Sequence, residues 1–215
     1  MDLSDEKVKK IVDEIFKKIE NSNSIDDLKK IRNDLDFIPQ KNRMKIVDYP
    51  KIEFSISPNE IKELKEKGLI SKENIFTENI TTKIKNPIAK ILYSIAWKNG
   101  DLTKLKHIIK GILDTENDNE PSKAFVFHQF GKYLTKSDFE PIIDQHVLRS
   151  FSIKITNSQK DIQDFRALDE INNKNKYLIY EYKDWLKSKE LKRIRKYHYY
   201  IDIILFELGK TIKKK

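Results

Sequence analysis

The sequence predicts a mainly α-helical protein, and two observations support that prediction. Of its 215 residues, 38% are hydrophobic and 36% are charged, while only five are glycine and six are proline. This is the composition of a globular chain that favours helices over loops. Apolar residues also recur at steps of three and four along most of the chain, which is the spacing of one helix face. The length is enough for one large domain or two small ones.

The first three helices follow from apolar spacing and from capping signals. Residues 3–19 carry aliphatic side chains at helical spacing, and Ser24 with Asp27 begins a second helix that reaches Leu35. Ser57 and Glu60 form a capping box with Pro58 at the first helical position, so a third helix is expected over residues 58–67.

Proline, glycine and acidic residues mark the helices that follow. Asn86-Pro87 begins a strongly apolar helix that Gly100 ends, and Asp101 caps the next one. Pro121 and Pro141 stand where two later helices begin. Gly209 is expected to end the last helix as a C-cap. The expected ranges are 87–97, 102–113, 122–134, 141–153, 158–172, 175–188 and 190–208.

One segment departs from the helical period. Between Pro39 and Ser57 the helical period fails, and over residues 52–56 apolar and polar residues alternate as in a short strand or an extended connector. One short β element is therefore expected near residues 45–56. We expect residues 1–85 to form an N-terminal helical region that includes this extended segment. Residues 86–215 are expected to form a second helical region with basic C-terminal helices.

Several functional classes are excluded by what the sequence lacks. Without cysteine there are no disulfides, cysteine-ligated zinc sites, iron–sulfur clusters or thiol nucleophiles. The four histidines lack the spacing of a metal site, and no GxGxxG, P-loop or GxSxG motif occurs, so neither a metal nor a cofactor is expected. An acidic N-terminus and the lack of a run of ~20 apolar residues predict a cytoplasmic protein that does not associate with membranes.

The positive charge of the chain is concentrated at its C-terminal end. Residues 183–215 contain eleven Lys and Arg against four Asp and Glu, out of a net charge of +9 for the whole chain. A basic region of this kind could bind a polyanion such as nucleic acid. The other interpretation is that the lysines reflect a compositional bias and form a solvated tail.

Two residues could support nucleophilic chemistry. Lys123 is expected in the first turn of the helix over 122–134, where the positive end of the helix dipole would lower the pKa of its amine. Asp144 is expected near the start of the following helix, where backbone N–H groups stabilise a carboxylate. An activated amine beside a fixed carboxylate would suit catalysis through a Schiff base. The alternative is that Asp144 only caps its helix and that Lys123 is solvated.

A resemblance covers roughly residues 119–151. The pattern Lys-Ala-x-x-Phe, then Phe-Gly, then Pro-Ile-Ile-Asp-x-His-Val-Leu-Arg is similar to the helix-hairpin-helix DNA glycosylases, especially the cysteine-free 8-oxoguanine glycosylases. The resemblance implies a glycosylase-like helical bundle in which Lys123 attacks the deoxyribose C1′ and Asp144 supports charge on the sugar. It also implies that His146 contacts a phosphate. Arg149 and Lys132 are further candidate DNA contacts, and Phe127 and Phe130 are candidate base-pocket residues.

The hairpin loop departs from the family pattern. Where the family has glycines before the lysine, this chain has Asp114, Glu116, Asp118 and Glu120, followed by Pro121. Such acids repel a phosphate backbone, and proline lacks an N–H donor. The loop therefore grips DNA differently, or its acids point away, or DNA binding has been lost.

The function expected from these features is excision of a damaged base, 8-oxoguanine foremost, with strand cleavage at the abasic site. The partner would be duplex DNA that contains the damaged base, and the enzyme would act as a monomer. Two alternatives stay open. One is a nucleic-acid-binding protein of the same fold without catalysis, and the other is a helical protein-interaction module.

Overall fold

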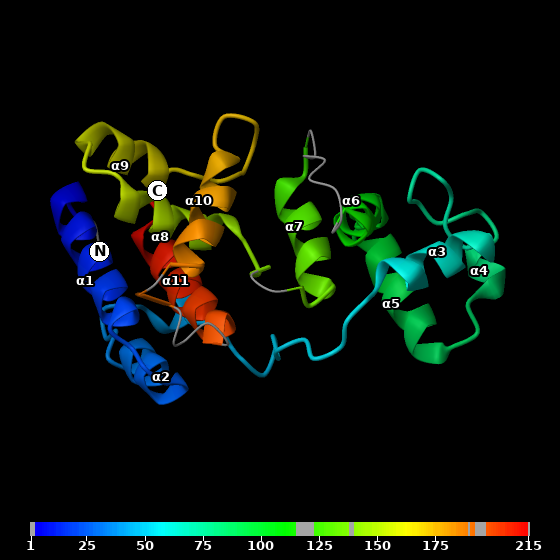
Figure 1. Ribbon diagram of the computed structural model, residues 1–215, viewed down its shortest axis with the longest axis horizontal. Coiled ribbons are helices and arrows are strands. Elements are labelled where there is room, and N and C mark those ends of the chain that lie inside the picture. Colours follow the sequence, from blue (N-terminus) through cyan, green and yellow to red (C-terminus); the bar gives the residue numbers. More distant parts are fainter. Residues whose placement is uncertain (1–2, 115–122, 138–139, 189, 192–196, 215) are drawn as a thin grey trace. The chain divides into compact units, whose positions relative to one another are not determined.

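A computed structural model describes residues 3–114, 123–137, 140–188, 190–191 and 197–214. It confirms the mainly α-helical class, because the described residues form helices joined by turns and loops and contain no strand (Figure 1). The chain divides into two compact units, which are described separately. Unit 1 comprises Met1–Ile52 and Pro141–Lys215, and unit 2 comprises Glu53–Glu140. This division differs from the expected boundary at residue 85, because the two ends of the chain fold together.

The prediction of a β element near residues 45–56 is wrong. Residues 46–48 form a turn, and residues 50–57 have no regular secondary structure. Ile56 donates its backbone N–H to the carbonyl of Leu134, at the end of a helix, at 2.9 Å. Alternating apolar residues form a strand only where a second extended segment pairs with them, and this segment meets a helix end instead. Among the described residues one isolated bridge joins Ile70 and Phe76.

Unit 1 is built around one central helix. Helix α8 contacts α1, α9, α10 and α11. Seven successive residues of α8, from Val147 to Ile153, are buried, so every side of the helix faces protein. The described helices of unit 1 are α1 (Asp5–Glu20), α2 (Ile25–Asn33), the 3₁₀ helix η1 (Gln40–Asn42), α8 (Gln145–Ile155), α9 (Gln159–Arg166), α10 (Tyr177–Leu186) and α11 (His198–Ile212).

The role expected for Gly209 as a C-cap is wrong. Helix α11 continues past Gly209 to Ile212. A Cβ atom at Gly209 would lie 1.9 Å from the carbonyl oxygen of His146 on α8, so only glycine allows the two backbones to approach this closely. Ser150 Oγ donates to the Leu205 carbonyl at 2.8 Å across the same contact. The glycine therefore serves helix packing within α11.

A buried carboxylate joins the two segments of unit 1. The Glu207 side chain on α11 has no exposed surface. It accepts hydrogen bonds from Arg32 Nη2 at 2.6 Å, from Arg43 Nη1 at 3.1 Å and from the Met44 backbone N–H at 2.8 Å. Two arginines and an amide thus compensate a charge that would be costly to bury alone.

A second buried carboxylate forms no ion pair with a cation of the described residues. Tyr182 on α10 donates its hydroxyl to Asp202 Oδ1 on α11 at 2.5 Å, and the backbone N–H of Ile142 also donates to this carboxylate. Burial raises the pKa of Asp202 to about 7, although both hydrogen bonds act to lower it. The protonated acid is therefore the form that the fold favours.

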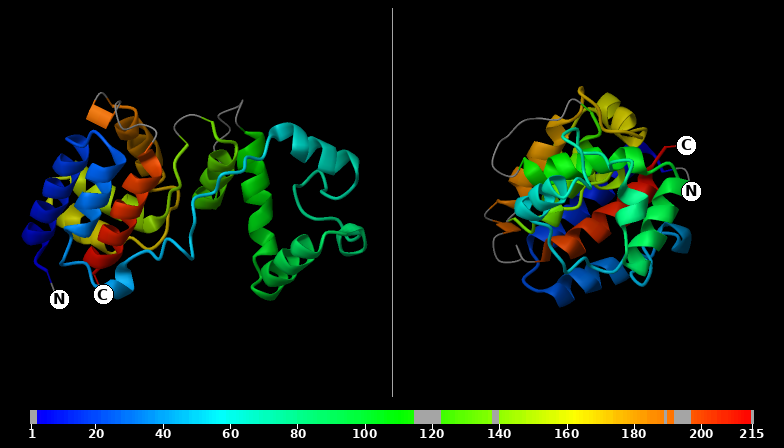
Figure 2. Two further views of the ribbon diagram at one scale, coloured as in Figure 1. Left: turned by 90° about the horizontal axis from the view of Figure 1, so that it is seen from below. Right: turned by 90° about the vertical axis from the view of Figure 1, so that its right-hand side faces the viewer.

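Unit 2 contains the helices of the middle of the chain, which the two views of Figure 2 show from other sides. The paired helices α6 and α7 form its densest contact. Gly68 and Gly100 have positive φ angles of 64° and 71° just after α3 and α5, as expected for residues that end helices. The helices of unit 2 are α3 (Pro58–Glu66), α4 (Ile80–Lys83), α5 (Pro87–Lys98), α6 (Leu102–Leu113) and α7 (Phe125–Leu134). No described helix in either unit has the length and apolarity to cross a membrane.

The raised pKa of Asp202 predicts a stability that falls as pH rises. The Asp202 carboxyl has its ordinary pKa in the unfolded chain and a pKa of about 7 in the folded protein. Between pH 4 and 7 the folded state therefore binds one proton more than the unfolded state. Its contribution is complete below pH 4 and is lost as pH rises through 7, which corresponds to about 4 kcal/mol at ~1.4 kcal/mol per pKa unit.

We expect Asp202→Asn to remove this dependence, so that the variant loses less free energy of unfolding than the wild type between pH 4 and 8. Urea denaturation at several pH values measures the free energy of unfolding of both proteins. The histidines are the same in both, so the difference between the two curves isolates Asp202. Parallel curves for the two proteins would contradict the assignment.

Candidate active site

Two glycines hold helices α6 and α7 together as a close hairpin. A Cβ atom at Gly111 would lie 2.0 Å from the His128 carbonyl oxygen, and one at Gly131 would lie 2.1 Å from the Ile108 carbonyl oxygen. The backbones of the two helices therefore touch where these glycines face each other. Both glycines lie inside helical patterns of the sequence, which is a signal of close packing that the sequence analysis did not use.

Lys123 stands just before this hairpin's second helix. Ala124 is the N-cap of α7 and has the left-handed angles φ 57° and ψ 40°, so the helix begins at Phe125. The expectation that Lys123 lies in the first turn is therefore wrong. Its side chain is exposed. Lys123 is nevertheless close enough to influence the pKa of His107 on α6. Burial is the largest cause that lowers this pKa, and the positive charges of Lys106 and Lys123 lower it further.

A buried histidine binds the acid at the start of the hairpin loop. His128 Nε2 lies 3.0 Å from Asp114 Oδ2, and His128 is only 5% exposed. Burial lowers the pKa of His128, while the hydrogen bond to Asp114 raises it. One of the four loop acids is thus turned onto α7. Glu116, Asp118, Glu120 and Pro121 lie outside the described residues.

The aromatic candidates on α7 have different surroundings. Phe127 is half-buried with Lys104 Nζ 5.2 Å from its ring centre, and Phe130 stacks on Tyr133 at 6.1 Å between ring centres. Lys132 lies in the last turn of the same helix and is half-buried. A role for these residues in holding a base or DNA stays a prediction.

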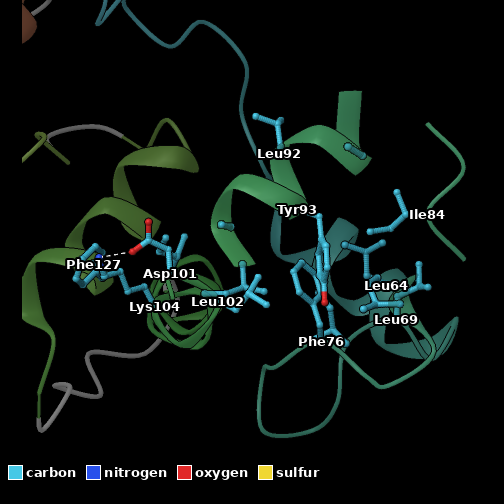
Figure 3. A pocket seen from close by; sticks show the side chains of 16 residues that line it. Leu64, Leu69, Phe76, Ile84, Leu92, Tyr93, Asp101, Leu102, Lys104 and Phe127 are labelled. Atoms are coloured by element: carbon cyan, nitrogen blue, oxygen red, sulfur yellow. Dashed lines mark hydrogen bonds and ion pairs between the residues drawn. The ribbon is translucent and has the colours of Figure 1, made fainter. Parts of the chain in front are cut away.

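Phe127 also lines an apolar cavity of about 620 Å³ in unit 2, which the sequence analysis did not predict. Figure 3 shows Phe76 and Tyr93 side by side, and Asp101 joined to Lys104 beside Phe127. Recognition of a base needs several hydrogen-bonding groups along its edge. Apart from this ion pair and Tyr93, the lining side chains are hydrocarbon, so the cavity suits apolar groups better than a base.

Asp144 is the N-cap of the central helix α8. Its backbone is extended, with φ −139° and ψ 162°, and its Oδ1 accepts the backbone N–H of His146 at 2.5 Å. The helix begins four residues later than Pro141, and Pro141–Ile143 lead into it without being helical. The carboxylate is therefore held at a helix start, as the sequence analysis expected, and it also serves as the cap.

Arg149 is a structural residue, and its assignment as a DNA contact is wrong. Its exposed fraction is 0%. Its guanidinium donates to the Gly209 carbonyl at 2.8 Å and to the Leu168 carbonyl, and it lies 3.6 Å from Asp169 Oδ1. A phosphate cannot reach a side chain that is enclosed by α8, α11 and the end of α9.

Arg149 also determines the tautomer of His146. Its Nη1 donates to His146 Nδ1 at 2.5 Å. Because a guanidinium has donors only, the neutral imidazole carries its proton on Nε2. Burial foremost lowers the pKa of His146, and Arg149 lowers it further while Asp144 raises it. His146 is thus a half-buried, neutral donor at the start of α8.

The candidate residues fall into two groups. Unit 1 brings Asp144, His146 and Arg149 together in the first turns of α8. Lys123 belongs to unit 2, together with Phe127, Phe130 and Lys132 on α7. No set of three or more His, Asp and Glu among the described residues could hold a metal ion. Comparisons with protein-family models, curated proteins and solved structures give no significant match to this chain.

The glycine contact of the hairpin predicts a large cost for Gly131→Ala. The added methyl group would overlap the Ile108 carbonyl oxygen, which belongs to backbone and cannot move aside without shifting α6. We expect a loss of more than about 3 kcal/mol in the free energy of unfolding, measured by urea denaturation.

Gly100→Ala is the matched control. No atom lies within 4 Å of a Cβ at Gly100, so the added methyl group meets no neighbour. The variant should lose only about 1–2 kcal/mol in the free energy of unfolding, because alanine is strained at the positive φ of 71°. Equal losses in the two variants would show that α6 and α7 do not approach this closely.

Proposed function

We propose that this chain is a DNA glycosylase with AP lyase activity that acts on duplex DNA containing a damaged base, with 8-oxoguanine as the first candidate. The main supporting observation is the carboxylate of Asp144, held at the start of α8 by the amide of His146 at 2.5 Å. It follows the non-helical Pro-Ile-Ile segment in the order on which the resemblance to helix-hairpin-helix glycosylases depends.

In the proposed reaction Lys123 supplies the nucleophile. Its neutral amine forms a bond to C1′ of the deoxyribose while the C1′–N bond to the base breaks, and the base leaves with the bonding electrons and takes up a proton. The ammonium formed at C1′ loses one proton. The C1′–O4′ bond then breaks as the nitrogen lone pair forms the C1′=N bond of a protonated imine, and O4′ takes up a proton. Abstraction of a C2′ proton then breaks the C3′–O bond and cleaves the strand. The exposed position of Lys123 before α7 is consistent with attack on an extruded nucleotide.

Two residues of α8 have supporting roles in this proposal. In the glycosylases that the chain resembles, a carboxylate at the position of Asp144 stabilises the positive charge that develops on the sugar as the base departs. His146 donates Nε2–H to a phosphate oxygen, and its neutral tautomer, determined by Arg149, supplies that donor at neutral pH. No metal or cofactor takes part in these steps.

One observation favours the alternative of DNA binding without catalysis. The Asp144 carboxylate is already used to cap α8, which is a sufficient structural reason for an acid at this position. In that case binding would survive the loss of Lys123 and would weaken steeply as salt is added.

Borohydride trapping distinguishes the two functions. The wild type is incubated with duplexes that contain 8-oxoguanine or an abasic site, and the reduced covalent adduct is quantified on a denaturing gel. We expect Lys123→Ala to abolish the adduct and Asp144→Asn to slow its formation by about 10²-fold or more, since one group would form the bond and the other would stabilise its charge.

Lys110→Ala, on the same hairpin, is the matched control and should retain the adduct. An adduct that persists in Lys123→Ala would assign the nucleophile elsewhere. If folded wild-type protein forms no adduct on either duplex, the lyase proposal fails, and salt-dependent binding then tests the alternative.

A further inference from the structure

Helix α5 of unit 2 is apolar but exposed. Ile88, Ile91, Leu92 and Ile95 are 67%, 60%, 60% and 53% exposed, and the helix contains no buried residue. Their spacing of i, i+3, i+4 and i+7 places the four side chains on one face. Contiguous apolar surfaces of this kind are characteristic of binding sites, whereas single exposed apolar residues are not.

This face continues into the apolar cavity. Ala89, Tyr93 and Ala96 lie on the neighbouring side of α5 and line the cavity of about 620 Å³. Leu92 belongs to both surfaces, since it lines the cavity and is 60% exposed. A ligand on the exposed face could therefore insert a side chain into the cavity beside it. Figure 3 shows Leu92 at one side of the cavity, with Tyr93 next to it.

The charged side chains on α5 and in the segment just before it are all lysines. Residues 79–100 contain four lysines and no aspartate or glutamate. These lysines are Lys83, Lys85, Lys90 and Lys98. All four are exposed, and none forms an ion pair with a described carboxylate. On α5 itself, Lys98 lies beside the apolar face, whereas Lys90 lies on the opposite side of the helix. A complementary partner would bring apolar side chains flanked by negative charge.

We propose that the exposed face of α5 and the adjoining cavity bind an amphipathic helix of a partner protein whose apolar anchors are flanked by Asp and Glu. Helix α5 has 12 residues and is about 18 Å long, which matches a partner helix of three to four turns. A second copy of this chain fits less well, because residues 79–100 contain no acidic side chain that could pair with Lys98 of the other copy. A flat lipid surface would cover the exposed face and leave the cavity unfilled.

Fluorescence anisotropy with synthetic peptides tests the proposal on the full chain. The probe is a fluorescein-labelled 18-residue peptide with leucines at i, i+3, i+4 and i+7 and with glutamates on both flanks. A second peptide has the same leucines and lysines in place of the glutamates. We expect saturable binding of the glutamate peptide and at least tenfold weaker binding of the lysine peptide.

Variants of exposed residues localise the site without disturbing the core. Leu92→Ser and Ile91→Ser should each weaken binding of the glutamate peptide at least tenfold. Val47→Ser is the matched control, because Val47 is 92% exposed and belongs to unit 1, and it should leave binding unchanged. Lys98→Glu should reduce the preference for the glutamate peptide, whereas Lys90→Glu, on the opposite side of α5, should leave it unchanged.

Four results would overturn the proposal: no saturable binding, equal affinity for the two peptides, equal weakening by Val47→Ser, or binding that persists in Leu92→Ser. Two further results would identify another occupant. A dimer seen by sedimentation velocity and lost in Leu92→Ser indicates a second copy. Binding to phosphatidylserine vesicles that is lost in Leu92→Ser, without peptide binding, indicates a lipid surface. None of these measurements depends on catalysis.

Discussion

The burial of helix α8 on every side is the constraint on which unit 1 depends. A helix that faces protein all round must place each of its polar side chains against a hydrogen-bonding partner. Ser150 meets the Leu205 carbonyl and Arg149 meets the Gly209 carbonyl, both on α11. These bonds are possible because Gly209 lets the two helices approach with their backbones in contact. The same packing holds the start of α8, and with it Asp144, in a defined position.

Buried charged side chains join the two ends of the chain. Glu207 on α11 binds Arg32 and Arg43 of the N-terminal segment, and Arg166 on α9 binds Asp5 and the Leu3 carbonyl. Such clusters are costly to desolvate, and breaking one partner from the other leaves an uncompensated charge. Each cluster therefore specifies which segments must meet. This explains why residues 1–52 belong with residues 141–215 in one unit.

The candidate site combines structural and chemical roles in neighbouring residues of α8. Asp144 caps the helix and offers a carboxylate at its start, while Arg149 stabilises the packing and selects the tautomer of His146. Lys123, in contrast, has no structural role of this kind, because it lies before α7 and its side chain is exposed. The sequence pattern identified these four residues together, but it could not separate a buried arginine from one that contacts a ligand.

The sequence by itself determined the helical class, most helix positions and the place of Asp144 near a helix start, because apolar spacing and caps act over a few residues. Only the tertiary structure decided what depends on distant neighbours. Residues 45–56 form no strand because no extended segment pairs with them, and Gly209 lies within a helix because α8 is close by. Arg149 is enclosed because three elements converge on it, and α5 stays exposed because no described segment of unit 2 covers it. Local periodicity predicts an element, whereas burial depends on the packing of residues that are far apart in the chain.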